Sequence, residues 1–124
     1  MKLDLISIVV QDIRRSLAFY RLLDWEIPEA QQDEKHVEIT LENGLRFAWD
    51  DLEMMSSFDP SASIQPHTVG AFLCSSPEEV DSQYNTLITA GYHGHKAPWD
   101  AFWGQRYAIV HDPDGHGIDL FAAL

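Results

Sequence analysis

The sequence predicts an α+β fold made of two βαβββ modules whose curved mixed sheets enclose a cleft. A strand pattern followed by a capped amphipathic helix occurs near the start of the chain and again in its second half, and short strand patterns follow each helix. We place the first module with its trailing loop at residues 1–60 and the second module at 61–124. Because each half alone is too small to bury a good core, we expect the two modules to form one structural domain.

The first module opens with a β-branched strand pattern at Leu3–Val10. Asp12 then suits a helix N-cap, and apolar residues at helical spacing predict a helix over Ile13–Leu23. Three short strands are predicted next, at Trp25–Pro28, Val37–Leu41 and Leu45–Trp49. The last two flank an Asn-Gly pair, which favours a hairpin. Residues 50–66 have no sustained period and predict a linker or covering loop.

The second module repeats this order with stronger local signals. After a strand pattern at Thr68–Cys74, Ser76 and Glu79 form a capping box, and Gly91 ends the predicted helix. Three strands are predicted to follow, at His93–Pro98, Gln105–Val110 and Gly117–Ala122. The segment Asp112–Gly115, with the sequence DPDG, has the residues that a tight turn between the last two strands requires.

The composition excludes several classes of partner. The chain has 124 residues, 20 acidic against 8 basic side chains, and a net charge of -12. A nucleic-acid backbone or an anionic membrane surface requires clustered Lys and Arg, so a neutral or cationic ligand fits better. Cys74 is the single cysteine, no apolar run reaches transmembrane length, and the first residues resemble a strand rather than a signal peptide. We therefore expect a cytoplasmic protein.

Three segments of the chain resemble a known superfamily. They are VVQDIRRSLAFY near the start, AFLCSSPEEVDSQYNTLITAG in the middle and WGQRYAIVHDPDGHGIDLFA at the end. Together with the order of elements, they resemble the vicinal oxygen chelate superfamily, which includes glyoxalase I, bleomycin-resistance proteins, fosfomycin-resistance enzymes and extradiol dioxygenases. The resemblance implies the glyoxalase/bleomycin-resistance fold, a cup of paired βαβββ modules, within a homodimer.

The resemblance also implies where a divalent metal would be held. Counting from the matching motifs, the three ligand positions correspond to Leu5, Val69 and Asp119. Aliphatic side chains cannot donate to a metal, so we expect no metal at these positions and no cofactor. His67 lies two residues before Val69, and a shift of register would bring it to the ligand position.

The remaining histidines have weaker signals. His93 and His95 share one face of a strand, which is minimal metal-ligand spacing, but surface histidines on an edge strand are the favoured interpretation. His111 and His116 flank the DPDG turn, where we expect them to face solvent as loop residues.

The candidate ligand-binding residues are aromatic or charged. They are Trp49, Trp99, Phe102, Trp103, Arg106, Asp119 and Phe121. The tryptophans fall on the strand and loop that would rim the cleft, where flat rings stack on planar or cationic groups. Asp119, the candidate catalytic residue, is expected to be partly buried and to need a partner, either a ligand cation or Arg106, with Arg106 favoured.

These observations lead to three hypotheses for function. The first is a metal-free, homodimeric binding protein of the bleomycin-resistance type. Such a protein would confer antibiotic resistance by sequestering an aromatic or cationic compound in a Trp-lined acidic cleft. The alternative is a lyase, isomerase or dioxygenase-like enzyme of the same superfamily that uses a displaced metal site or Asp119 as acid–base catalyst. The third is an accessory domain that packs against a partner protein.

Overall fold

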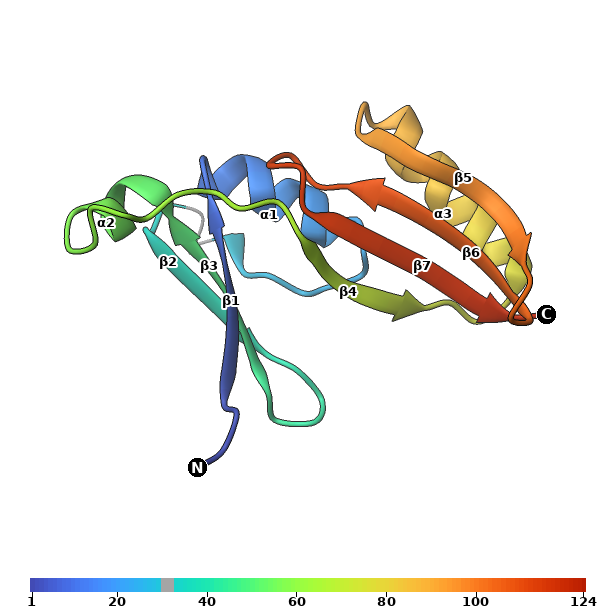
Figure 1. Cartoon of the computed structure of the whole chain (residues 1–124), viewed down its shortest axis with the longest axis horizontal. Coiled ribbons are helices and arrows are strands. Elements are labelled where there is room, and N and C mark those ends of the chain that lie inside the picture. Colours follow the sequence, from blue (N-terminus) through green and yellow to red (C-terminus); the bar gives the residue numbers. More distant parts are fainter. Residues whose placement is uncertain (30–32) are drawn as a thin grey trace. The chain divides into compact units, whose positions relative to one another are not determined.

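The computed structural model describes residues 1–29 and 33–124, and the chain divides into two compact units (Figure 1). Unit 1 comprises Met1–Gln65 and unit 2 comprises Pro66–Leu124, so the division falls a few residues after the predicted boundary at residue 60. The predicted α+β class is confirmed, because each unit combines a mixed sheet with at least one helix. Among the described residues, no helix is both long enough and apolar enough to span a membrane.

The described residues of unit 1 form a three-stranded mixed sheet and two α-helices. Its elements are β1 (Leu5–Val10), α1 (Ile13–Arg21), β2 (His36–Thr40), β3 (Arg46–Asp51) and α2 (Leu52–Ser56). β3 is the central strand, parallel to β1 and antiparallel to β2. The helix α1 begins at the predicted cap, where the Asp12 carboxylate accepts a hydrogen bond from the Arg15 amide at 3.2 Å.

The strand predicted at Trp25–Pro28 is not present in the described part of unit 1. The carbonyls of Ile27 and Pro28 accept hydrogen bonds from the Arg21 guanidinium, at 3.0 and 3.3 Å. Pro28 in addition has no amide proton to give to a sheet. In the part of the first module that the structure describes there are therefore three strands instead of the predicted four.

The predicted loop over residues 50–66 contains the short helix α2. The Asp51 carboxylate caps it by accepting a hydrogen bond from the Met54 amide at 3.1 Å. The helix has only 5 residues, which is too short for a helical period to be visible in the sequence.

Trp49 lies in the core of unit 1, so the prediction that it rims a cleft is wrong. Its side chain has no exposed area, and its ring centroid lies 5.4 Å from that of Tyr20, 5.0 Å from that of Phe47 and 6.0 Å from that of Trp25. The central strand β3 is buried from Phe47 to its end, which indicates cover on both faces. The indole therefore packs against aromatic neighbours and has no exposed face on which a ligand could stack.

Unit 2 has the full β-α-β-β-β order that the sequence predicts. Its elements are β4 (Thr68–Leu73), α3 (Pro77–Thr89), β5 (His93–Ala101), β6 (Gln105–His111) and β7 (Gly117–Ala123). The strands lie in the order β4-β7-β6-β5, with β4 parallel to β7 and the other pairs antiparallel. α3 packs against β5, β6 and β7 (Figure 1).

Local side-chain chemistry sets both ends of α3. The Ser76 hydroxyl accepts a hydrogen bond from the Glu79 amide at 3.1 Å, and the Glu79 carboxylate in turn accepts from the Ser75 amide. Val80 and Leu87 are the buried residues of the helix. Gly91 follows the helix with a φ of 97°, a left-handed conformation that glycine adopts without strain.

The DPDG turn joins β6 to β7 as predicted. The Asp112 carboxylate accepts hydrogen bonds from the amides of Asp114 and His116, both at 2.9 Å. Gly115 closes the turn with a φ of 88° and donates to the Asp112 carbonyl at 3.0 Å. Asp112 and His116 are both buried, so the prediction of a solvent-facing His116 is wrong.

The sheet of unit 2 has two faces of different character. The face against α3 carries small and aliphatic buried side chains, namely Ala108, Val110, Ile118, Leu120 and Ala122. The intervening residues of β6 and β7 point to the opposite face, because successive side chains of a strand alternate. This second face, called the far face below, carries Tyr107, Ile109, His111, Asp119 and Phe121, all of them half-buried.

We predict that Ser76→Ala destabilises the protein by about 1 kcal/mol, because it removes the N-cap of α3. The free energy of unfolding from urea titration measures the change. Ser82→Ala in the same helix is the matched control and is expected to be neutral, since Ser82 lies inside the helix, where alanine is the better residue. Equal effects of the two substitutions would contradict the capping role.

A second prediction concerns His36 on β2. Its Nδ1 lies 2.5 Å from Asp50 Oδ1, and this hydrogen bond is the main cause that raises the pKa of His36 above its usual 6.5. The stability gained from the pair is therefore complete below about pH 6.5 and is lost as the pH rises through the raised pKa. The difference in Tm between wild type and His36→Gln should be small, because the imidazole is half-exposed, and should shrink as the pH increases. A difference that is constant with pH would refute this.

Candidate functional site: an aromatic surface and a histidine cluster on one sheet

Five rings gather where β5 turns into β6 and continue across the sheet to β7. They form what we call the aromatic surface, made of Trp99, Phe102, Trp103, Tyr107 and Phe121. Ring centroids are 6.0 Å apart for Trp99–Trp103, 5.3 Å for Trp103–Tyr107 and 6.2 Å for Tyr107–Phe121. Phe102, whose centroid lies 5.0 Å from that of Trp103, is 97% exposed, and Trp103 is 48% exposed.

The strand register explains why these rings meet. Trp99 on β5 lies opposite Tyr107 on β6, and Tyr107 lies opposite Phe121 on β7. Directly opposed residues in antiparallel strands have their side chains in contact on the same face. Trp103 is held by a hydrogen bond from its indole nitrogen to Gln105 Oε1 at 2.8 Å. Four of the predicted binding residues thus lie together, while Trp49 belongs to the core of unit 1.

One cation already lies over this surface. The Lys96 ammonium is 4.8 Å from the centroid of the Trp99 ring, a distance typical of cation–π attraction. The face of Trp99 is therefore placed so that a positive group can approach it.

Asp119 has a partner that the sequence did not indicate. Its Oδ2 accepts a hydrogen bond from the Tyr107 hydroxyl at 2.5 Å. Burial, and then the bond to Asp119, raise the pKa of Tyr107 to about 12, so the phenol keeps its proton and acts as donor. Tyr107 could have been identified only from the pairing of β6 with β7, because it is remote from Asp119 in the sequence.

The predicted pairing of Arg106 with Asp119 is wrong. The Arg106 guanidinium binds Asp81 of α3 through Nε at 2.9 Å and Asp100 of β5 through its terminal nitrogen at 3.1 Å. Arg106 is adjacent to Tyr107, and a shift of one residue along a strand moves a side chain to the other face of the sheet. Arg106 therefore stabilises the packing of α3 and lies away from the far face.

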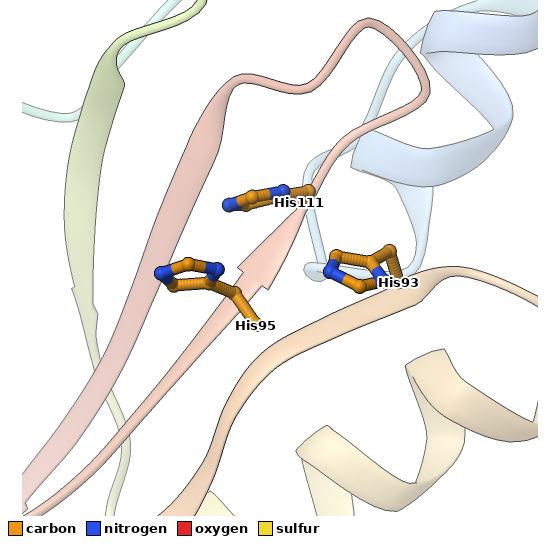
Figure 2. Close-up of side chains that lie close together, drawn as sticks. All are labelled: His93, His95 and His111. Atoms are coloured by element: carbon orange, nitrogen blue, oxygen red, sulfur yellow. The ribbon is translucent and has the colours of Figure 1, made fainter.

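A cluster of three imidazoles lies at the end of the sheet where β5 begins and β6 ends. Figure 2 shows that His93 and His95 reach it from β5 and His111 from β6, with the rings close together. Ring centroids are 4.6 Å apart for His95–His111, 5.1 Å for His93–His111 and 6.5 Å for His93–His95. Burial and, next, the neighbouring His95 and His93 lower the pKa of His111. We call these three residues the histidine cluster.

The histidine cluster includes a residue whose placement differs from the prediction. His93 and His95 lie in one cluster, although the register of β5 shifts between Gly94 and Lys96. His111 is a half-buried strand residue rather than a solvent-facing loop residue. The signal that could have found it is the hairpin pairing, which places His111 opposite His93.

A pocket of about 360 Å³ lies beside the histidine cluster on unit 2. Its lining includes His95 and His111 from the cluster, together with His67, Ile109 and Asp119. The pocket therefore connects imidazole groups to the carboxylate that Tyr107 holds.

The positions at which the superfamily resemblance implies metal ligands do not suit a metal. Leu5 on β1 and Val69 on β4 have aliphatic side chains without donor atoms, and Asp119 alone offers oxygen. His67 precedes β4, and its ring lies against His116, with centroids 4.9 Å apart. One carboxylate, even with His67 added, is too few for the three protein ligands that a catalytic metal usually has.

Comparison with known proteins agrees with this fold. Among solved structures, a glyoxalase/bleomycin resistance protein/dioxygenase from Nocardioides is 23% identical with a TM-score of 0.74, over 100% of this chain and 84% of that one. A glyoxalase/bleomycin resistance protein/dioxygenase family enzyme from Burkholderia phytofirmans PsJN is 20% identical with a TM-score of 0.76, over 100% of both chains. A glyoxalase-related enzyme from Fulvimarina pelagi is 18% identical with a TM-score of 0.79, over 98% of this chain and 88% of that one. At these identities the likeness shows the fold alone.

The family assignment rests on the sequence match. No curated protein matches the chain. The family model described as Glyoxalase/Bleomycin resistance protein/Dioxygenase superfamily matches residues 2–120, which is nearly the whole chain. The chain belongs to the glyoxalase/bleomycin resistance protein/dioxygenase superfamily.

Proposed function

We propose that this chain is a small-molecule-binding protein that sequesters a planar aromatic or cationic compound on the aromatic surface, without a metal at the superfamily's ligand positions. The observation that carries the proposal is the gathering of Trp99, Trp103, Tyr107 and Phe121 on a partly exposed sheet face. Exposed rings of this kind are enriched where proteins bind flat ligands. Membership of a superfamily whose description includes bleomycin resistance proteins also supports it.

The charges around the surface favour a cationic ligand. Lys96 lies over Trp99, which supports the idea that the ring attracts positive charge. A cationic ligand would displace the lysine and take its place. Asp119 accepts the Tyr107 hydrogen bond and lies two residues before Phe121 on β7, so it supplies negative charge on the same face. The net charge of -12 attracts cations at longer range.

The test uses N-methylacridinium, a planar aromatic cation, as the probe for binding by isothermal titration calorimetry. We predict saturable binding to chelator-treated protein and a loss of about fivefold or more in affinity for Trp103→Ala, since stacking contacts contribute about 1–3 kcal/mol. Acridine, which is neutral at pH 8, should bind more weakly than the cation.

Phe58→Ala provides the matched control, because Phe58 is an exposed aromatic residue of unit 1 outside the aromatic surface. This variant should bind N-methylacridinium as wild type does. If Trp103→Ala and Phe121→Ala both bind as wild type, or if binding requires a divalent metal, the proposed function is wrong.

A second candidate function is acid–base catalysis by Asp119. It is supported by the position of Asp119 in the lining of the pocket beside His95 and His111, where a substrate proton could be transferred. The hydrogen bond from Tyr107 would orient the carboxylate for this role.

Asp119→Asn separates the two functions. For a binding protein, the substitution should reduce affinity for N-methylacridinium more than affinity for acridine, because only charge is removed. For an enzyme, turnover of glyoxalase-type or dioxygenase-type substrates would be present in wild type and absent in Asp119→Asn. Circular dichroism and Tm check that the variant is folded. Detection of such a turnover would overturn the assignment as a pure binding protein.

A further inference from the structure

We propose that the histidine cluster binds a divalent transition-metal ion, with zinc as the first candidate. The cluster consists of His93, His95 and His111, and none of the three corresponds to a metal position that the superfamily resemblance implies. The inference does not depend on the proposed function, because the aromatic surface and the histidine cluster involve different side chains.

The three imidazoles are close enough to share one ion. One nitrogen from each ring can be chosen so that all three lie within 4.8 Å of one another. Zinc binds imidazole nitrogen at about 2.0–2.1 Å, so three ligands around one ion lie about 3.4 Å apart. Rotation of the side chains closes this gap, and His93 and His95 are exposed and have room to rotate.

The backbone that carries the cluster is a paired sheet. His93 lies directly opposite His111 in the antiparallel register of β5 and β6. The register then shifts between Gly94 and Lys96, so His95 occupies a β-bulge. A bulge redirects a side chain relative to a regular strand, and here the His95 ring lies stacked on that of His111 at an angle of 18°. Functional sites on strands are held more firmly than sites on loops.

The donor set selects the class of metal. Three imidazoles suit zinc, copper, nickel or iron, whereas calcium and magnesium require oxygen ligands. Three protein ligands also leave a coordination position for water or a small molecule, as in zinc sites that are not purely structural. His95 and His111 both line the pocket of about 360 Å³, so that open position would be accessible from it.

Binding of an ion would also link the first residues of β5 to the end of β6. β5 is the edge strand of the sheet, and its pairing with β6 is irregular at two places, between Gly94 and Lys96 and between Lys96 and Trp99. A metal ion bound by both His93 and His111 would hold the start of β5 against the end of β6. We therefore expect zinc to raise the Tm, since a ligand that binds only the folded state stabilises it.

The experiment titrates zinc into the full chain, purified without a polyhistidine tag and stripped with a chelator. Calorimetry should give one zinc ion per chain, and the Tm should rise with zinc concentration. Cobalt(II) serves as a spectroscopic probe, because its visible absorption changes when nitrogen ligands replace water. Calcium should produce neither effect.

Single substitutions locate the site. His93→Ala, His95→Ala and His111→Ala should each weaken zinc binding by more than about tenfold, the smallest loss usual for removal of even an outer-shell partner of a metal. His93 and His95 are exposed, so their variants keep the test valid if the half-buried His111 variant does not fold. His36→Ala is the matched control, since it removes a histidine from unit 1 and leaves the cluster intact.

The outcomes separate this inference from the proposed function. Trp103→Ala should bind zinc with wild-type affinity and have reduced affinity for N-methylacridinium. His93→Ala should have reduced affinity for zinc and bind N-methylacridinium as wild type does. Zinc affinity that is unchanged in both His93→Ala and His95→Ala would overturn the metal site. Loss of stoichiometric zinc binding in His36→Ala, or the absence of saturable zinc binding to wild type, would overturn it as well.

Discussion

The hydrogen bonds of Asp112 in the β6–β7 turn are the constraint on which the candidate site depends. They fix the hairpin so that Tyr107 lies opposite Phe121 and Ile109 lies opposite Asp119. A slip of one residue would turn every side chain of a strand to the other face. The aromatic rings and the carboxylate of the far face would then point to the face that α3 covers. The chemistry of unit 2 thus depends on the register that this turn sets.

Local signals explain why much of unit 2 could be predicted from the sequence. The capping box at Ser76, the glycine at Gly91 and the DPDG turn each act within a few residues, so they are visible in the chain itself. The prediction of a strand at Trp25–Pro28 was wrong because the structure of this segment depends on contacts outside it. Whether its carbonyls bond to a strand or to the Arg21 guanidinium is decided by the folded arrangement, which composition does not reveal.

The sequence predicts only those features of the site that depend on one segment of the chain, and not those that depend on pairing between strands. Trp99 and Trp103 were recognised because they cluster in sequence, whereas Tyr107 and His111 take part through pairing between strands. Trp49 and Arg106 were assigned to a binding surface because of their residue types. In the structure Trp49 is buried in the core of unit 1, and Arg106 pairs with Asp81 of α3. Residue type suggests chemistry, but strand register and burial decide which groups can meet.

The far face of unit 2 thus combines rings and a carboxylate with imidazoles at the end of the same sheet. The central claim is that this face, and not the core of unit 1, meets the ligand. The indole N–H signals of the four tryptophans in a two-dimensional ¹⁵N–¹H NMR spectrum test it directly during titration with N-methylacridinium. The account predicts that the signals of Trp99 and Trp103 shift while those of Trp25 and Trp49 remain in place. Shifts at Trp25 and Trp49 with none at Trp99 and Trp103 would contradict it.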